Sequence, residues 1–142
     1  MKRMSNTLGP IFGVLGLCLM GAPASSATSL SVDSPEYKRG RLLYIQCRAC
    51  HDLEAGGPRK VGPHLAGIVG RPSAAVSDFA YSGALESANL VWDAATLDRF
   101  LQRPSAVVPG NTMAFAGIAN AADRAALITY LTVESTQSAE TR

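Results

Sequence analysis

Side chains that form disulfides or bind soft metals are scarce in this chain. The 142 residues include three Cys, two His and four Met. Cys47 and Cys50 are only three positions apart, and a disulfide across so short a span would be strained. This composition excludes a small domain held together by disulfides. The few sulfur and imidazole groups are therefore available for another purpose.

The sequence also lacks an apolar run long enough to span a bilayer comfortably. The longest one, residues 8–20, is too short for that. It follows Lys2 and Arg3 and precedes small residues, an order typical of a cleaved secretory signal. We expect a signal peptide over residues 1–27, with cleavage after Ala27 favoured over cleavage after Ala24. A retained membrane anchor is the alternative.

An excess of charge of either sign is absent once this leader is set aside. Thirteen Lys and Arg face eleven Asp and Glu, and Lys2 and Arg3 belong to the leader. Residues 28–142 are thus balanced in charge, so we expect no nucleic-acid partner and no attachment to anionic membranes. Their length suits one domain. We expect its core over about residues 34–132 and a polar tail over 133–142, frayed from Glu134 onward.

No alternating apolar pattern of the kind typical of β-strands is present, and the sequence predicts an all-α fold. Ser34, Asp93 and Asn120 are suitable N-cap residues, and Asp123 resembles the partner of Asn120 in a capping box. Apolar residues follow each cap at helical spacing. The expected helices cover about residues 35–50, 93–103 and a last segment from 120, with one short helical turn within 82–88.

Two long loops rich in Gly and Pro, over about 54–72 and 104–119, join these helices. Loops of this length are unusual in so small a domain. They become reasonable if they pack against the faces and edges of a flat cofactor.

The segment Cys47-Arg48-Ala49-Cys50-His51 indicates which cofactor this is. In an exported protein, C-x-x-C-H is typical of covalent haem c attachment. The two thiols lie about one helical turn apart, so both can add to the vinyl groups along one haem edge. His51 can then bind the iron from one side. The sequence predicts one covalent haem c, attached through Cys47 and Cys50.

Two other interpretations of this segment are weaker. A thioredoxin-type redox dithiol requires a βαβ setting, which the sequence lacks. A zinc site could use Cys47, Cys50, His51 and His64, but adjacent Cys50 and His51 would then have to bind one tetrahedral ion, which is awkward.

The second axial position on the iron could be filled by Met113, His64, water or nothing. His64 follows His51 closely in a loop that must lie on the same side of the haem. Met113 lies in a distant loop and is the one methionine after the leader, so it is the favoured ligand. A ligating histidine usually donates its other N–H to a carbonyl, and Pro63 in a rigid Gly62-Pro63 turn is a plausible acceptor.

Haem propionates need hydrogen-bond donors where they are buried. Arg71, Tyr81 and Trp92 can supply a guanidinium, a phenol O–H and an indole N–H. Together they are candidates for the propionate side of the site.

These motifs resemble those of class I cytochromes c, close to the mitochondrial and bacterial c2 branch. The resemblance covers about residues 34–132 and runs without a gap from His51 to Met113. The motifs that carry it are Cys47-Arg48-Ala49-Cys50-His51, Gly62-Pro63-His64-Leu65-x-Gly67, Val69-Gly70-Arg71, Phe79-x-Tyr81-Ser82, Val91-Trp92, Leu101-x-x-Pro104, Pro109-Gly110-x-Thr112-Met113-x-Phe115-x-Gly117-Ile118 and Arg124-x-x-Leu127-Ile128-x-Tyr130-Leu131.

The resemblance implies a cytochrome c fold, with short helices and long loops around one haem. It implies that His51 and Met113 are the axial ligands and that the Pro63 carbonyl is the partner of His51. Arg71, Tyr81 and Trp92 would surround a propionate. The first and last helices would cross at Gly40, with Tyr44, Leu127 and Tyr130 nearby.

The chain also departs from that pattern. Gly40 to Cys47 is one residue shorter than in the mitochondrial branch, so we expect a shifted or kinked first helix. Phe100 replaces a Tyr that often bonds the methionine sulfur, and Leu85 replaces a propionate-side Asn. The lysine ring used for docking is missing, with Gln46, Ser105, Ala106 and Thr112 at such places. A weak positive rim could come from Arg48, Arg59, Lys60 and Arg103.

The function expected from these residues is electron transport, not enzymatic catalysis. We expect a monomeric one-electron carrier in the bacterial periplasm, meeting respiratory-chain or dehydrogenase partners transiently, without stable membrane insertion after signal cleavage. One alternative is a haem enzyme, gas-binding protein or sensor with an open iron site. Another is a dedicated cytochrome subunit of a larger dehydrogenase.

Overall fold

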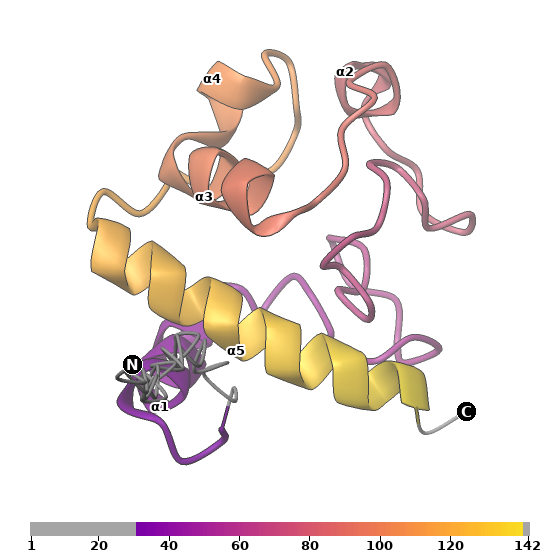
Figure 1. Cartoon of the computed structure of the whole chain (residues 1–142). Coiled ribbons are helices and arrows are strands. Elements are labelled where there is room, and N and C mark those ends of the chain that lie inside the picture. Colours follow the sequence, from indigo (N-terminus) through magenta and orange to yellow (C-terminus); the bar gives the residue numbers. More distant parts are fainter. Residues whose placement is uncertain (1–30, 141–142) are drawn as a thin grey trace, which may run out of the picture.

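The computed structural model describes residues 31–140, with side chains to Ser135. The expected signal peptide, residues 1–27, lies outside the described residues. The described part is helical, as predicted, and its extended segments meet only at one isolated antiparallel bridge between Pro72 and Val91. The helices are α1 Pro35–Leu43, the 3₁₀ turn η1 Tyr44–Gln46, α2 Gly83–Glu86, α3 Ala94–Gln102, α4 Pro104–Val107 and α5 Ala121–Glu140 (Figure 1).

The first helix begins where expected but ends earlier. Ser34 accepts a hydrogen bond from the backbone N–H of Tyr37 at 3.1 Å. The expectation of one α-helix to residue 50 was wrong, because α1 tightens into η1 after Leu43. A 3₁₀ turn rises about 2.0 Å per residue against about 1.5 Å for an α-helix. Three 3₁₀ residues thus cover the length of four α-helical ones, which compensates for the short interval before Cys47.

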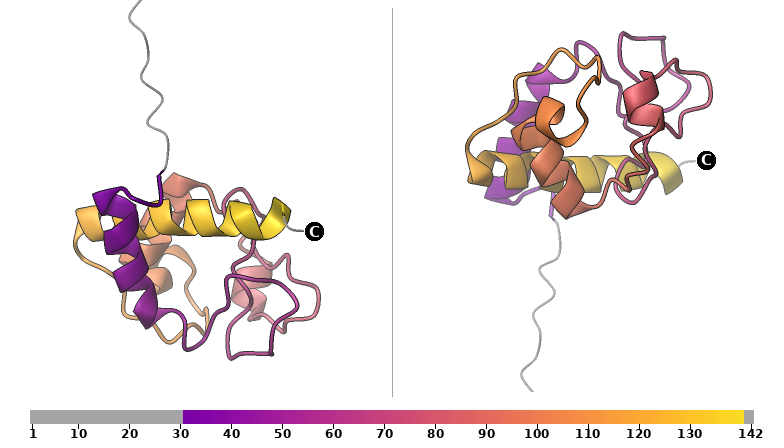
Figure 2. Two further views of the ribbon diagram at one scale, coloured as in Figure 1. Left: turned by 90° about the horizontal axis from the view of Figure 1, so that it is seen from below. Right: turned by 90° about the horizontal axis from the view of Figure 1, so that it is seen from above.

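α1 crosses the N-terminal half of α5 at Gly40 (Figure 2). A Cβ added at Gly40 would lie 2.6 Å from the Cβ of Tyr130, so a side chain there would force the helices apart. Tyr130 also meets the rings of Tyr37 and Tyr44, at centroid distances of 5.2 and 5.4 Å. Leu127 beside them is wholly buried. The crossing expected from the resemblance is present.

At the start of α5, the expected capping box between Asn120 and Asp123 is not formed. Asn120 caps it, accepting from the N–H groups of Ala122 and Asp123 at 2.8 and 3.2 Å. The Asp123 carboxylate, however, does not complete a capping box. It pairs with the Arg39 guanidinium of α1 at 2.9 and 3.0 Å, and so ties the two crossing helices together.

The end of α5 corrects another expectation. We expected fraying from Glu134, yet the helix continues to Glu140. Ser135 is 1% exposed, and its carbonyl accepts from the N–H of Gly67 at 3.3 Å. The Glu134 carboxylate accepts from the Tyr37 hydroxyl. These contacts with distant segments hold a stretch whose sequence alone is polar and unremarkable.

The short helices α2 and α4, together with α3, lie on the side of α5 away from α1 (Figure 1). Asp93 caps α3 by accepting from the N–H of Thr96 at 2.7 Å, as expected, and its apolar face packs on α5. Pro104 ends α3 and begins α4. Ser82 caps α2 within the predicted short turn.

No helix described over residues 31–140 is both long and apolar enough to cross a membrane.

Candidate cofactor site

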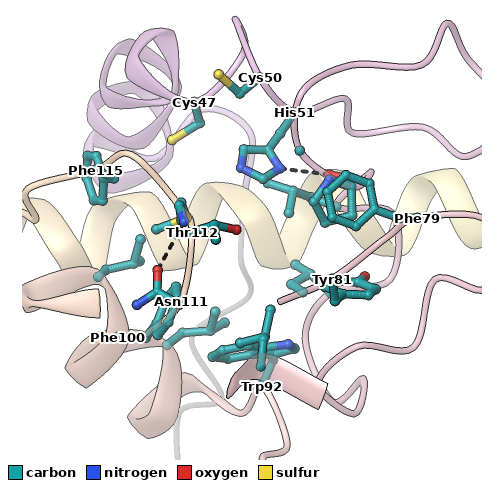
Figure 3. A pocket seen from close by; sticks show the side chains of 18 of the residues that line it. Cys47, Cys50, His51, Phe79, Tyr81, Trp92, Phe100, Asn111, Thr112 and Phe115 are labelled. Carbon is teal, nitrogen blue, oxygen red and sulfur yellow. Dashed lines mark hydrogen bonds between the residues drawn. The ribbon is translucent and has the colours of Figure 1, made fainter. Parts of the chain in front are cut away.

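A cavity of about 250 Å³ lies between these helices and loops. Every residue that the sequence predicted for the site lines it: Cys47, Cys50, His51, Pro63, Arg71, Tyr81, Trp92 and Met113. Most of the remaining wall is apolar: Val61, Leu65, Ile68, Phe79, Leu85, Leu97, Phe100, Leu101, Phe115, Leu127 and Leu131. Figure 3 shows Cys47 and His51 reaching toward it from one side, with Trp92 and Phe100 on the other.

The two cysteines are half-buried free thiols. They belong to a turn after η1, in which the N–H groups of Cys50 and His51 donate to the Cys47 carbonyl at 3.0 and 2.9 Å. Burial, together with the neighbouring Cys50, raises the pKa of the Cys47 thiol to about 11. Both cysteines thus line the cavity as free thiols, not joined by a disulfide.

His51 has the protonation and the orientation of a metal ligand. Its Nδ1 lies 2.7 Å from the Pro63 carbonyl oxygen. A carbonyl only accepts, so Nδ1 carries the proton and Nε2 presents the lone pair. Burial lowers the pKa of His51; the Pro63 hydrogen bond opposes this, and the nearby Lys60 charge adds to it. The imidazole is therefore neutral at pH 7, as metal binding requires.

The residue before Pro63 must be glycine, because the His51 ring leaves no room for a side chain at position 62. A Cβ there would lie 2.7 Å from Nδ1 and 2.9 Å from Nε2 of His51. The Gly62 N–H donates to the Cys50 carbonyl at 2.8 Å. Gly62-Pro63 is therefore more than a turn, because its backbone packs directly on the imidazole.

Met113 approaches the cavity on the loop after α4. Its N–H donates to Asn111 Oδ1 at 3.1 Å, and Asn111 Nδ2 donates to the Val108 carbonyl at 2.7 Å. Asn111 also lines the cavity. Asn111 was not among the residues predicted for the site, although Asn after Pro109-Gly110 is a common Asx-turn signal that could have identified it.

His64, the other candidate for the second axial position, is directed elsewhere. It lines a separate, polar cavity of about 270 Å³ together with Asp52, Arg59 and Lys60. Its carbonyl accepts from the Arg71 guanidinium at 2.9 Å. The structure brings Met113, and not His64, to the cavity that holds His51.

The three propionate candidates face the cavity in different ways. Arg71 donates to the carbonyls of Ala66 and His64 at 2.6 and 2.9 Å, so it also holds its own loop together. The Tyr81 hydroxyl accepts from the N–H of Val76 at 3.4 Å. Trp92 is buried, with its ring 4.8 Å from that of Phe100.

The donor set decides between the interpretations of the cysteine segment. Within the described part of the chain, no three His, Cys, Asp or Glu side chains gather to hold a metal ion. The zinc alternative thus lacks its ligands, and the redox-dithiol alternative lacks its sheet. Two free cysteines three positions apart, a neutral imidazole and apolar walls around one cavity fit an iron carried by a covalently attached porphyrin.

Comparison with known proteins agrees. No family model matches the chain. It is 41% identical over 96 residues to a cytochrome c of Kluyveromyces lactis, an alignment that covers 68% of this chain and 87% of that one. The chain belongs to the cytochrome c family. A cytochrome c2 iso-2 of Magnetospirillum fulvum is 47% identical over 85 residues, covering 60% of this chain and 88% of its own.

Other relatives of this cytochrome c family member differ in length. A cytochrome c homolog of Rickettsia prowazekii is 46% identical over 92 residues, or 65% of this chain and 53% of that protein. The chain thus spans about half the length of such relatives. The solved structure of cytochrome cH from Methylobacterium extorquens superposes with a TM-score of 0.64 at 35% identity, covering 68% of this chain and 97% of that one.

Family membership establishes the cofactor. Cytochromes c carry covalent haem c, and this chain presents Cys47 and Cys50 at the required spacing along the cavity. As a family, cytochromes c are electron-transfer proteins and not enzymes.

Proposed function

We propose that this protein is a one-electron carrier whose haem iron is bound by His51 and Met113. The observation that carries the proposal is that the attachment cysteines, His51 and Met113 line one apolar cavity although they come from distant segments. When bound, the haem supplies the electron-transfer chemistry, because its iron cycles between Fe(III) and Fe(II). A thioether ligand favours Fe(II) and raises the reduction potential.

The other lining residues have supporting roles in this proposal. The Pro63 carbonyl keeps the proton on Nδ1 of His51, so that Nε2 stays available to the metal. Arg71, Tyr81 and Trp92 supply polar groups on the propionate side. The apolar wall excludes water, which limits the access of other ligands to the iron.

We further propose that the protein works in the bacterial periplasm, as a monomer that meets redox partners of a respiratory chain or a dehydrogenase transiently. The leader pattern of residues 1–27 supports export. The balanced charge of residues 28–142 supports docking that depends only weakly on salt. The mass of the mature protein would identify the cleavage position and reveal a haem-sized increment together.

The axial ligands are tested by spectroscopy on protein made with a haem-maturation system. We expect a sulfur-to-iron charge-transfer band in the oxidised protein and its loss in Met113→Ala. A high-spin spectrum in the wild type would contradict the proposal and favour an open iron site.

Covalent attachment is tested separately. Haem in the wild type should resist extraction with acid acetone, whereas any haem retained by the double variant Cys47→Ser, Cys50→Ser should be extracted. Haem that resists extraction in the double variant would contradict attachment through these thiols.

A further inference from the structure

The backbone carbonyl of His51 is held by two side chains from different parts of the chain. The Tyr44 hydroxyl donates to it at 3.0 Å, and the Lys60 ammonium donates at 3.2 Å. Tyr44 comes from η1, before the cysteines, and Lys60 comes from the loop after them. Residues on both sides of the attachment segment thus converge on one oxygen atom.

The Lys60 side chain is committed to this region. Besides the His51 carbonyl, its Nζ reaches the Arg48 carbonyl at 2.9 Å and an Asp52 carboxylate oxygen at 3.2 Å. An ammonium has three N–H groups, and these acceptors match that number. The Lys60 side chain is only 29% exposed. Its position is that of a cap on the carbonyls of the Cys47–His51 turn, not that of a free surface charge.

Tyr44 reaches the same oxygen because of the way α1 ends. The 3₁₀ turn begins at Tyr44, whose ring packs on Tyr130 at the helix crossing, 5.4 Å between centroids. The Tyr44 carbonyl accepts from the N–H groups of Cys47 and Arg48 at 2.8 and 3.0 Å. One buried residue thus links the helix crossing to both ends of the attachment segment.

We propose that Tyr44 and Lys60 are positioning residues that fix the backbone of His51, while Pro63 fixes its ring. This inference rests on the proposed role of His51 as an iron ligand. With the ring nitrogen and the carbonyl both held, the direction of Nε2 is set before the metal binds. The Lys60 ammonium places a positive charge beside His51, and the neutral Tyr44 hydroxyl directs the positive end of its O–H dipole at the same carbonyl, so removal of either donor favours Fe(III).

The variants that test this remove one donor at a time. Tyr44→Phe deletes the hydroxyl and keeps the ring on Tyr130, and Lys60→Met keeps the aliphatic stem. Tyr37→Phe is a matched control, because Tyr37 packs on Tyr130 at 5.2 Å but donates to Glu134. Lys38→Met is the second control, because Lys38 pairs with exposed Asp33 at 3.7 Å.

The first readout is the ¹³C chemical shift of the His51 carbonyl in reduced protein, which reports hydrogen bonding at that oxygen. We expect it to move in Tyr44→Phe and in Lys60→Met and to stay in place in both controls. Lys60→Arg, which keeps a cation and donors, should restore most of the wild-type shift.

The second readout is the reduction potential. Each single change should lower the equilibrium constant for reduction about twofold. The double variant should lower it about tenfold, or about 59 mV for one electron, because the carbonyl then loses both donors. Such non-additivity is the signature of a shared acceptor. Asp52→Asn, which removes a negative charge and leaves Tyr44 in place, should change the potential in the opposite direction.

The outcomes separate this inference from the proposed function. If the wild type has the charge-transfer band but Tyr44→Phe leaves the His51 carbonyl shift unchanged, the positioning role is wrong and the carrier function stands. A double variant whose change in reduction potential equals the sum of the two single changes would also contradict the positioning role. If the wild type lacks the band, the Met113 ligation fails, and the carbonyl shifts still decide whether Tyr44 and Lys60 hold His51.

Discussion

The two segments that carry the proposed axial ligands, at His51 and at Met113, are held very differently. His51 is held through its ring nitrogen by Pro63, through its carbonyl by Tyr44 and Lys60, and by the backbone of Gly62 against its ring. The hydrogen bonds at Met113 involve its backbone, with the N–H donating to Asn111 and the carbonyl accepting from the N–H of Phe115 at 2.9 Å. One proposed ligand is fixed by side-chain and backbone contacts together, and the other by backbone hydrogen bonds to Asn111 and Phe115 and by packing.

This difference indicates which of the two proposed ligands would leave the iron first when the protein is perturbed. The His51 side is pre-organised by contacts that do not need the iron, so its arrangement should survive changes elsewhere. The Met113 side depends on a short loop and on a thioether, which is only a weak hydrogen-bond acceptor. Under the proposed ligation, whether both axial positions of the iron stay filled is therefore decided mainly on the Met113 side.

The largest expected effect comes from disrupting the contact between the Gly62 backbone and the His51 ring. In Gly62→Ala the new Cβ would lie 2.7 Å from Nδ1 of His51, and the ring cannot move without losing Pro63. Overpacking of this kind costs about 3 kcal/mol. We expect little haem-loaded protein and a lowered urea midpoint.

Gly57→Ala in the same loop is the matched control. Its Cβ would meet only the Asp52 carboxylate, whose nearer oxygen lies at 3.3 Å and which is the end of a side chain that can move. If Gly62→Ala were as stable and as fully loaded as Gly57→Ala, the contact between this backbone and the imidazole would have no energetic importance.

A smaller effect is expected at Asn111 on the Met113 side. Asn111→Ala removes both the acceptor for the Met113 N–H and the donor to Val108, at a cost of about 1–2 kcal/mol. Added imidazole should then displace Met113 at a concentration about tenfold lower. The measurement is the imidazole concentration that halves the charge-transfer band.

Asn111→Asp keeps the oxygen that accepts from Met113 and loses only the amide donor. It should therefore need more imidazole than Asn111→Ala does. Equal midpoints for wild type, Ala and Asp would mean that packing alone holds Met113, and that the Asx turn contributes nothing.

The sequence predicted which side chains line this cavity better than it predicted how those side chains are held in place. Cys47, Cys50, His51 and Met113 could be predicted to share one site because covalent haem attachment and a soft ligand each demand a particular residue type, and the structure places all four around one cavity. Helix starts at Ser34 and Asp93 could be predicted because a cap is a local interaction. All of these depend on residue identity and short spacing.

What the sequence did not predict depends on contacts between distant segments. The extension of α5 to Glu140 relies on Ser135 packing beneath the loop at Gly67. The short interval from Gly40 to Cys47 indicated a shifted or kinked first helix, but it did not indicate that the chain would tighten into a 3₁₀ turn at Tyr44. Lys60 looks like a rim charge in the sequence, and only the fold shows that Asp52 and two carbonyls engage it.

The smallest expected effect comes from a substitution that should hold Met113 more firmly. Phe100 lines the cavity, is 8% exposed and packs on Trp92, and it stands where related chains often carry a tyrosine that bonds the methionine sulfur. Phe100→Tyr should therefore raise the imidazole concentration needed to displace Met113 about threefold. This corresponds to a net gain of about 0.7 kcal/mol, within the range of one added hydrogen bond.

The same hydroxyl added elsewhere on the cavity wall separates a specific bond from a general change in polarity. Phe79→Tyr is that control, since Phe79 lines the cavity beside Tyr81, 4.8 Å between ring centroids. It should leave the imidazole midpoint unchanged. If both variants raised the midpoint equally, the gain would come from cavity polarity. If Phe100→Tyr lowered it, the added oxygen would be poorly accommodated against Trp92, and packing, not hydrogen bonding, would limit how firmly this side can be held.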